Sequence, residues 1–198
     1  MVTAGLVWVG DPDRARQFLP AMRALGPPTS QRVHELSYLQ LQRMDDSVQG
    51  HTVRRYWKGH YIEDLSDGAV DAFWRRGTAD GRGHRLPTVS LQAYGGAIAD
   101  VPDDDSAFSQ RNARFEFVAA AAWTDPAEHA ARMAAARQCG ASVEPFASGA
   151  YVNTLGDDGT AGVRRAYPAR KLARLTALKD AYDPDNVFHL NQNIRPSR

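Results

Sequence analysis

One apolar segment constrains the fold of this chain more than any other. Residues 114–123 read RFEFVAAAAW, the most hydrophobic strand-like stretch in the sequence. Side chains alternate between the two faces of a strand, so Phe115 and Phe117 point one way while Glu116 and Val118 point the other. A carboxylate on so apolar a strand lies either near a sheet edge, where it can pair with an arginine, or against a cavity. The segment therefore predicts a buried strand with one unusual acidic side chain.

The rest of the pattern favours an α+β fold, in which helices pack on one face of an antiparallel sheet. Runs of β-branched and aromatic residues predict further strands at residues 5–9, 53–62, 88–94 and 151–155. Caps and breakers predict helices at residues 11–25, 35–46, 66–76 and 125–138, and two more after residue 155, the second starting at Pro168. Residues 81–85 predict a loop. This order contains too few strand–helix–strand units for a doubly wound fold.

The charge balance argues against several classes of partner. The formal net charge is +1 and the arginines are scattered, so we expect no nucleic acid and no membrane surface as partner. No stretch is apolar enough to cross a bilayer, and the first ten residues lack the cationic start of a signal peptide. If residue 1 is the natural start, these features predict a cytoplasmic protein.

Common catalytic and metal-binding motifs are missing from the sequence. The six histidines form neither an H-x-x-x-H pair nor a pair with cysteine, so we expect no metal site. There is no G-x-S-x-G nucleophile elbow and no G-x-G-x-x-G dinucleotide loop. The one cysteine, Cys139, follows an alanine-rich run, which is typical of a small buried residue; a reactive thiol is the alternative.

The end of the chain carries a longer motif. Residues 182–196 read YDPDNVFHLNQNIRP. This run resembles the Y-D-P-x-N-x-F-x-x-N-Q-x-I-x-P signature that closes the berberine-bridge-enzyme-like FAD-linked oxidases of the vanillyl-alcohol-oxidase superfamily. Further segments resemble the same family in order: GLVWVGDP at 5–12, LPAMRALGPP at 19–28, YWK at 56–58, LSD at 65–67, GG at 95–96 and YVN at 151–153. The resemblance covers essentially the whole chain.

The sequence departs from the family pattern at several positions. Gly59 and Gln110 stand where serine and histidine are usual, and Pro168 and Leu172 replace a glycine and a tyrosine. Thr154 occupies the position of a tyrosine that can be the base in plant members. A threonine hydroxyl is too weak an acid for that role, so we do not expect tyrosine-type proton abstraction there.

The resemblance implies that the chain is the second half of such an oxidase. Residues 1–150 would be part of the substrate-binding domain and residues 151–198 the berberine-like C-terminal segment, whose helices and tail return toward a flavin domain; together they would form one globular unit. FAD is the implied cofactor of the complete enzyme. No phosphate-binding loop of a flavin domain is found in the sequence, so we expect that the chain alone does not retain FAD.

The resemblance also implies site residues. Family members carry a catalytic or substrate-contacting acid on the apolar strand, seven residues before a tryptophan, and Glu116 has this spacing from Trp123. Tyr151 is the second catalytic candidate; a core aromatic residue with a satisfied hydroxyl is the alternative. Amides both donate and accept hydrogen bonds, as the pyrimidine edge of a flavin requires. The cofactor-binding candidates are therefore Asn153, Asn191, Gln192 and Asn193.

The tail that carries the last three amides also contains hydrophobic residues. Phe188, Leu190 and Ile194 bracket the amides in the sequence. Such residues predict a tail that docks on protein; a disordered polar tail is the alternative.

Together these features predict part of an FAD-dependent oxidoreductase that oxidises a small organic substrate. In the complete enzyme a hydride would pass to the flavin, with O₂ as acceptor. The partners would be a small-molecule substrate and, in a split arrangement, a separate FAD-domain chain. The alternative is a non-catalytic, stand-alone module, derived from such an oxidase, that binds a ligand or a partner.

Overall fold

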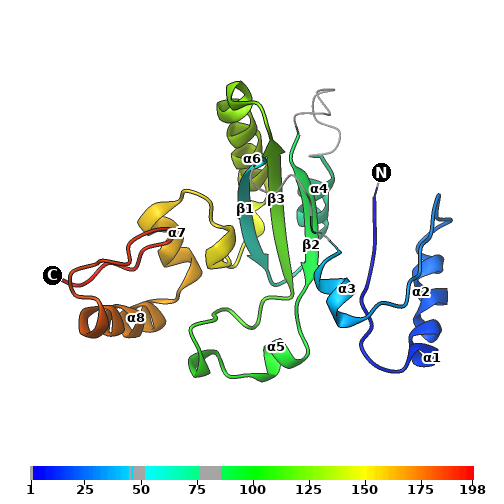
Figure 1. The fold of residues 1–198 in the computed structure, drawn as a ribbon, viewed down its shortest axis with the longest axis horizontal. Coiled ribbons are helices and arrows are strands. Elements are labelled where there is room, and N and C mark those ends of the chain that lie inside the picture. The colour runs from blue at the N-terminus through cyan, green and yellow to red at the C-terminus, as the bar shows by residue number, and fades with distance from the viewer. Residues whose placement is uncertain (1, 45, 47–51, 76–85) are drawn as a thin grey trace. The chain divides into compact units, whose positions relative to one another are not determined.

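The chain forms two compact units in the computed structural model, Met1–Gly50 and His51–Arg198 (Figure 1). The structure describes residues 2–44, 46, 52–75 and 86–198. The predicted loop at residues 81–85 lies outside the described residues, as does Arg76, the predicted end of one helix.

The first unit contains short helical segments. α1 (Pro12–Ala15), η1 (Arg16–Phe18) and α2 (Leu19–Ala24) follow one another directly, and α3 (Tyr38–Gln42) stands further along the chain. The Asp11 carboxylate starts α1 by accepting a hydrogen bond from the Asp13 backbone N–H at 2.9 Å. The helix predicted at residues 11–25 is thus confirmed as three consecutive pieces, whereas the one predicted at 35–46 is shorter than predicted.

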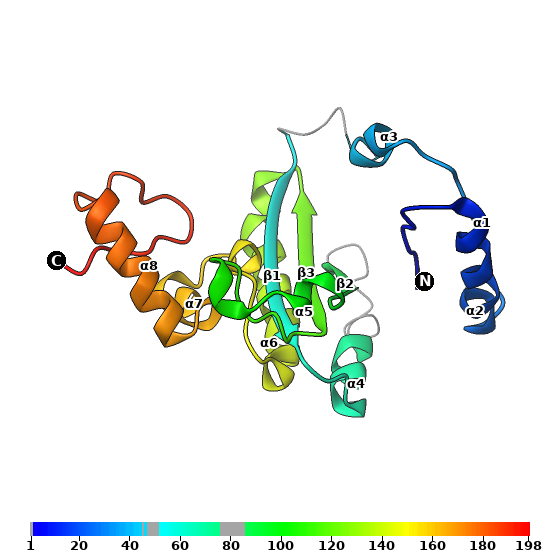
Figure 2. The same cartoon turned by 90° about the horizontal axis from the view of Figure 1, so that it is seen from below.

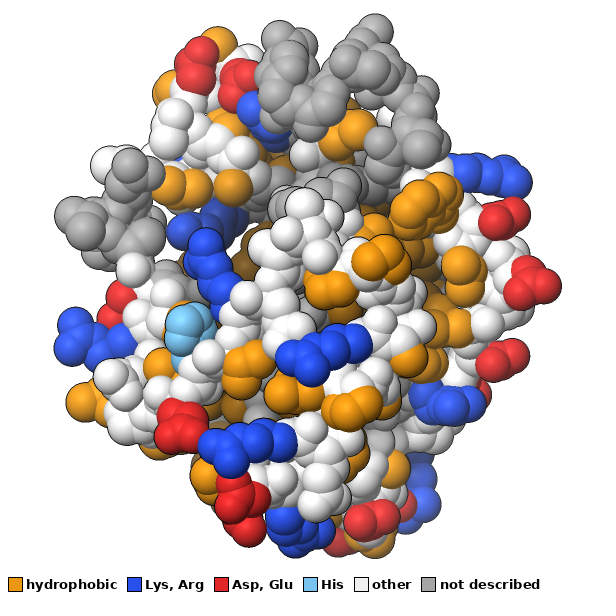
Figure 3. Space-filling view, turned by 90° about the vertical axis from the view of Figure 1, so that its right-hand side faces the viewer, with side chains coloured by type: hydrophobic (Ala, Val, Ile, Leu, Met, Phe, Trp, Pro, Cys, Tyr) orange, Lys and Arg blue, Asp and Glu red, His pale blue; other side chains and the backbone are white. Residues whose placement is uncertain are grey.

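The apolar side chains of the first unit lie open. The strand predicted at residues 5–9 is wrong, because the described part of this unit contains no strand with which it could pair. None of the described side chains of the unit is buried, and Val9 and Leu25 are 89% and 76% exposed. On the face drawn in Figure 3, hydrophobic side chains lie at the surface in several patches between charged ones. Hydrophobic burial inside this unit therefore adds little to its stability.

The second unit is built around a three-stranded antiparallel sheet. Its strands are β1 (Arg54–Ile62), β2 (Thr88–Ala93) and β3 (Phe115–Trp123), in the order β1-β3-β2. In register, Glu116 at the centre lies between Tyr61 of β1 and Gln92 of β2. The apolar segment recognised in the sequence is thus the central strand, and the predicted antiparallel α+β fold is confirmed.

Two helices cover one face of this sheet (Figures 1 and 2). They are α4 (Asp67–Arg75), whose first turn is capped by the Ser66 hydroxyl, and α6 (His129–Val143). Alternate side chains of β3 point toward these helices, as the period of a strand requires. The main buried cluster between sheet and helices consists of Ile62, Phe117, Ala119, Cys139 and Val143. Cys139 is thus a buried core residue.

Shorter elements complete the second unit. Along the chain, β2 is followed by α5 (Ala97–Asp100) and η3 (Asp103–Asp105), which precede β3. The short helices η4 (Pro126–Glu128) and η5 (Glu144–Phe146) come directly before and after α6. The chain then continues through η6 (Val152–Thr154), α7 (Gly159–Ala166) and α8 (Ala169–Tyr182). The two helices predicted after residue 155 are confirmed.

The segment at residues 151–155 is a tight turn, so the strand predicted there is wrong. Backbone pairing with β1 stops earlier, where Tyr61 exchanges hydrogen bonds of 2.9 Å with Ser148 and Gly149. The chain then crosses the open face of the sheet over Gly59. A Cβ atom on Gly59 would lie 2.6 Å from the Cβ of Thr154, closer than side chains tolerate. Glycine at this position therefore lets η6 lie directly on the sheet.

A buried histidine links three elements on the other face. The Nδ1 atom of His60 lies 2.6 Å from the guanidinium of Arg165, and its Nε2 atom lies 3.0 Å from the carbonyl of Gly140. A guanidinium only donates, so Nδ1 accepts and Nε2 carries the proton that it donates to Gly140. Arg165 also pairs with Asp158 at 3.2 Å, and Asp158 with Lys58. The neutral imidazole thus joins β1 to α6 and α7.

We expect Gly59→Ala to destabilise the second unit by about 1–3 kcal/mol, the usual cost of overpacking. Gly5→Ala is the matched control, because a Cβ atom there meets nothing within 4 Å. Urea unfolding of both variants measures the difference. A Gly59→Ala protein as stable as the Gly5→Ala protein would contradict the close approach of η6.

His60 predicts a loss of stability in acid. Burial, and secondarily the charge of Arg165, lower its pKa from 6.5 to about 4. Its stabilising contribution is therefore complete above pH 6.5 and is lost as the pH falls toward about 4. The loss is at most about 3 kcal/mol, since one pKa unit corresponds to about 1.4 kcal/mol.

The test is urea unfolding across this pH range for His60→Gln, whose amide can donate to the Gly140 carbonyl in place of Nε2 without titrating. The variant should lose less stability on acidification than the wild type. His189→Gln, in the exposed tail, is the control. Equal acid sensitivity of all three proteins would exclude His60 as a cause.

Candidate active site

The face of the sheet opposite the helices carries a buried carboxylate. Glu116 is only 4% exposed, although it lies on the side of β3 that faces away from the helices. Its Oε2 atom accepts a hydrogen bond from the Tyr94 hydroxyl at 2.7 Å, and its Oε1 atom accepts one from the Thr154 hydroxyl at 3.0 Å. The edge alternative considered for this residue is wrong, because β3 is the central strand.

Tyr94 follows β2 directly and is fixed there by its backbone N–H, which donates to the Arg114 carbonyl at 2.8 Å. Burial raises the pKa of the Tyr94 hydroxyl, and the hydrogen bond and charge of Glu116 raise it further. The hydroxyl therefore stays protonated and acts as the donor to Glu116. No motif in the sequence marks Tyr94. The register places Gln92 beside Glu116, and Tyr94, two residues further along the chain, lies on the same side and reaches the carboxylate.

Aromatic rings surround this carboxylate. The ring of Tyr61 meets the ring of Tyr94 edge-on, with centroids 5.6 Å apart. The ring centroids of Tyr61 and Tyr151 are 6.5 Å apart. Tyr151 in turn contacts Phe108 at 6.0 Å. Tyr61 is 1% exposed, its pKa is raised by burial, and its hydroxyl has no hydrogen-bond partner within the described part of the chain. The site thus combines one carboxylate with several phenols that can donate hydrogen bonds.

The structure brings two further predicted residues to the same region. Tyr151 is half-buried, and its hydroxyl accepts a hydrogen bond from the exposed amide of Asn153 at 2.7 Å. The Tyr151 carbonyl lies 3.1 Å from the Thr154 hydroxyl that also contacts Glu116. Three of the predicted site residues, Glu116, Tyr151 and Asn153, therefore belong to one group of contacts.

The tail amides occupy a separate position. The amide of Gln192 donates to the carbonyl of Gly156 at 2.7 Å. Asn191 has a left-handed backbone with φ of 61°, which turns the chain here, and it is exposed. The side-chain oxygen of Asn193 is buried and has no hydrogen-bond partner in the described residues. Of the three amides, one is thus used inside the chain and one oxygen is left available as an acceptor.

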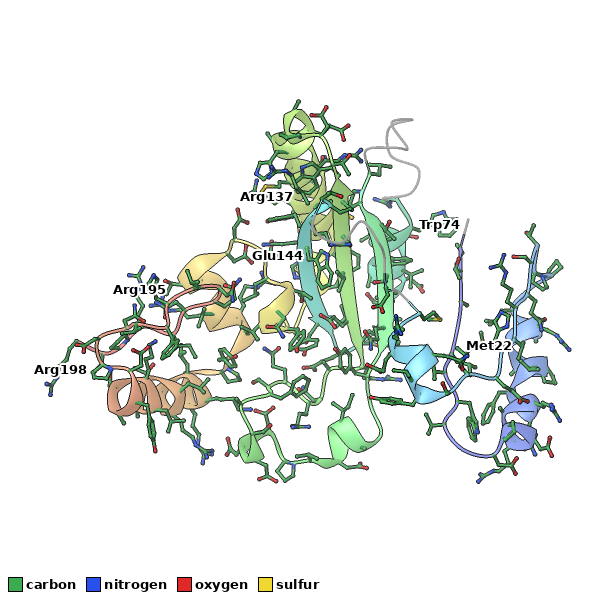
Figure 4. The ribbon with its side chains drawn as sticks, viewed as in Figure 1. Met22, Trp74, Arg137, Glu144, Arg195 and Arg198 are labelled. Atoms are coloured by element: carbon green, nitrogen blue, oxygen red, sulfur yellow. The ribbon has the colours of Figure 1, made fainter. Side chains whose placement is uncertain are left out.

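The turn that receives Gln192 is anchored to the sheet by charge. The Tyr56 hydroxyl donates to Asp157 at 2.5 Å, and burial, followed by this hydrogen bond, raises the pKa of Tyr56 to about 12. Arg137, on α6 (Figure 4), pairs with the same carboxylate. Its guanidinium lies over the Tyr56 ring, 5.2 Å from the ring centroid. The tail therefore docks on a firmly held segment next to Gly156.

The hydrophobic residues of the tail do not take part in this docking. Phe188 and Leu190 are 82% and 80% exposed, and only Ile194 is half-buried. Phe188 and Leu190 therefore leave apolar surface open, and docking of these residues on another part of a protein stays a prediction.

Neither a metal cluster nor a membrane-spanning helix is found among the described residues. These residues include no cluster of three or more histidine, cysteine or acidic side chains arranged to hold a metal ion. Nor does any described helix combine the length and apolar character needed to span a membrane.

Known proteins match the chain in both sequence and fold. Residues 150–195 match the family described as berberine and berberine like. The uncharacterized FAD-linked oxidoreductase YvdP of Bacillus subtilis is 34% identical over 105 residues, which are 53% of this chain and 23% of that protein. An FAD-linked oxidoreductase of Dictyostelium discoideum is 24% identical over 196 residues, covering 96% of this chain and 41% of that protein.

Solved structures share the fold along nearly the whole chain. The wild-type BBE-like 1 protein of Physcomitrella patens matches with a TM-score of 0.77 at 21% identity, covering 96% of this chain and 43% of that one. CrmK, a flavoenzyme of caerulomycin biosynthesis, matches with a TM-score of 0.75 at 21% identity, over 95% of this chain and 43% of that one. The chain thus spans less than half the length of these proteins. In sequence and fold it corresponds to the C-terminal part of a berberine-bridge-enzyme-like FAD-linked oxidoreductase.

Proposed function

We propose that the chain forms the substrate-side half of an FAD-dependent oxidase that acts on a small organic molecule. Residues 1–150 would belong to the substrate-binding domain and residues 151–198 to the berberine-like segment. The observation that carries this proposal is the buried carboxylate of Glu116, held by two hydroxyls on the open face of the sheet. An acid in such a position can take a proton from an alcohol, a sugar lactol or an activated carbon.

The chain's own residues would bind and orient the substrate. Glu116 would accept the substrate proton, while Tyr94 and Thr154 hold its two oxygens in place. Tyr151, whose hydroxyl is fixed by Asn153, would line the substrate side next to the buried Tyr61. The bound flavin would supply the hydride acceptor, and O₂ would reoxidise it.

The amides of the tail suit the edge of a flavin. The pyrimidine edge presents both donors and acceptors, and the buried side-chain oxygen of Asn193 is an acceptor without a partner in the described residues. Asn191 and Asn153 are exposed and could contribute both groups, whereas Gln192 would support the tail through Gly156. These residues fit FAD chemically, without supplying the phosphate-binding groups that it also needs.

Open apolar surface supports the need for a second domain. Tyr182, Phe188 and Leu190 are each at least 80% exposed. Residues of this size in the open are typical of a surface that another protein part covers. A flavin domain in the same protein or in a separate chain would cover it. The same surface favours the second candidate, a non-catalytic module that binds a partner protein.

FAD binding separates these functions. The purified chain should be colourless and should not bind FAD in a fluorescence titration, because it lacks the groups that hold the pyrophosphate. Adding the flavin domain of a relative as a separate chain should give a yellow complex. Tight stoichiometric binding by the chain alone would contradict its dependence on a flavin domain. Failure of a folded flavin domain to bind the chain would favour the non-catalytic module.

Glu116→Gln tests the role of the carboxylate in a complex or fusion that oxidises a substrate. The amide keeps the shape of the side chain but cannot take the proton, so kcat should fall about 100- to 10,000-fold with little change in KM. Oxygen consumption measures this. Glu144→Gln is the control, since Glu144 is an exposed acid away from the sheet face. An unchanged kcat in Glu116→Gln would remove Glu116 from the reaction.

A further inference from the structure

The hydroxyl of Thr154 has two acceptors within reach. It lies 3.0 Å from Oε1 of Glu116 and 3.1 Å from the backbone carbonyl of Tyr151. A hydroxyl carries one proton but can also accept hydrogen bonds through its two lone pairs. Thr154 can therefore donate fully to only one of these two oxygens at a time.

Tyr94 stands in a different position. Its hydroxyl donates to Oε2 of Glu116 at 2.7 Å, which is the shorter of the two hydrogen bonds to this carboxylate. The phenol therefore keeps Oε2 as an acceptor in every state of the site. Any proton that Glu116 takes up is then left to Oε1, on the side of Thr154.

We propose that Thr154 is a positioning residue that reverses its hydrogen bond when Glu116 is protonated. With the carboxylate ionised, Thr154 donates to Oε1. When Oε1 receives a proton, that O–H donates to the Thr154 hydroxyl, whose own proton turns to the Tyr151 carbonyl. Only the transferred proton changes its covalent partner. This inference rests on the proposed role of Glu116 as a proton acceptor.

The reversal matters because the site is closed to water. Glu116 is 4% exposed and Thr154 is equally buried, so an unmatched donor or acceptor here would cost the full desolvation of that group. A hydroxyl between two oxygens satisfies both protonation states with the same heavy-atom positions. The other titratable groups near the carboxylate are the phenols of Tyr61, Tyr94 and Tyr151. Burial raises the pKa of Tyr61 and of Tyr94, so these two keep their protons at neutral pH.

The backbone makes this arrangement possible. Gly59 leaves the space into which Thr154 fits, and the turn of η6 brings the hydroxyl back to the carbonyl three residues earlier.

The test follows the Tyr151 carbonyl by NMR in the chain alone. Tyrosine precedes valine only at Tyr151–Val152, so carbonyl-¹³C tyrosine with ¹⁵N valine yields one carbonyl–amide signal. Glu116→Gln imitates the protonated acid, because Tyr94 holds the amide oxygen and the NH₂ group then faces Thr154. We expect the Tyr151 carbonyl resonance to move downfield as it gains a hydrogen bond.

Variants at residue 154 are the controls. Thr154→Ser in the Glu116→Gln background should keep the shift, whereas Thr154→Val should abolish it. If Thr154→Val does not fold, Thr154→Ala replaces it as the variant without a hydroxyl. A resonance that Glu116→Gln leaves unmoved would overturn the proposal. So would a shift that persists in Thr154→Val. Because no FAD is present, this result is independent of the flavin-binding test of the proposed function.

Discussion

The burial of one side of the central strand is the constraint on which the rest of the second unit depends. Phe117 and Ala119 of β3 pack against α6 and α4 in the main core. Because side chains alternate along a strand, this packing forces Glu116 onto the opposite face. The position of the carboxylate is therefore a consequence of core formation, and it cannot be moved without also reversing the hydrophobic face of the strand.

The open face tolerates a buried acid because neutral hydroxyls surround it. Tyr94 comes from the end of β2 and Thr154 from η6, so two distant parts of the chain meet at one carboxylate. The charged groups lie elsewhere: Lys58, Asp158 and Arg165 form their network around His60 on the helix side. Among the described residues, the printed hydrogen-bond partners of Glu116 are therefore neutral hydroxyls, whereas this charged network surrounds His60.

Much of the fold could be predicted from local sequence signals, because they report local physics. The strands predicted at residues 53–62 and 114–123, the Ser66 cap and the helix predicted to start at Pro168 all appear close to where they were predicted. The failures share a cause. Residues 5–9 and 151–155 have the composition of strands, but a strand also needs a neighbour with free backbone groups. Such a partner is set by tertiary structure, which the composition of a segment does not report.

The sequence by itself determined the class of fold, the two faces of the central strand and the resemblance to a family of FAD-linked oxidases. It also singled out Glu116, since one acid in an apolar strand is visible without a structure. Only the tertiary structure decided which groups meet that acid. The contacts of Tyr94 and Thr154 depend on strand register and on the space above Gly59, because hydrogen bonds require positions within a few tenths of an ångström.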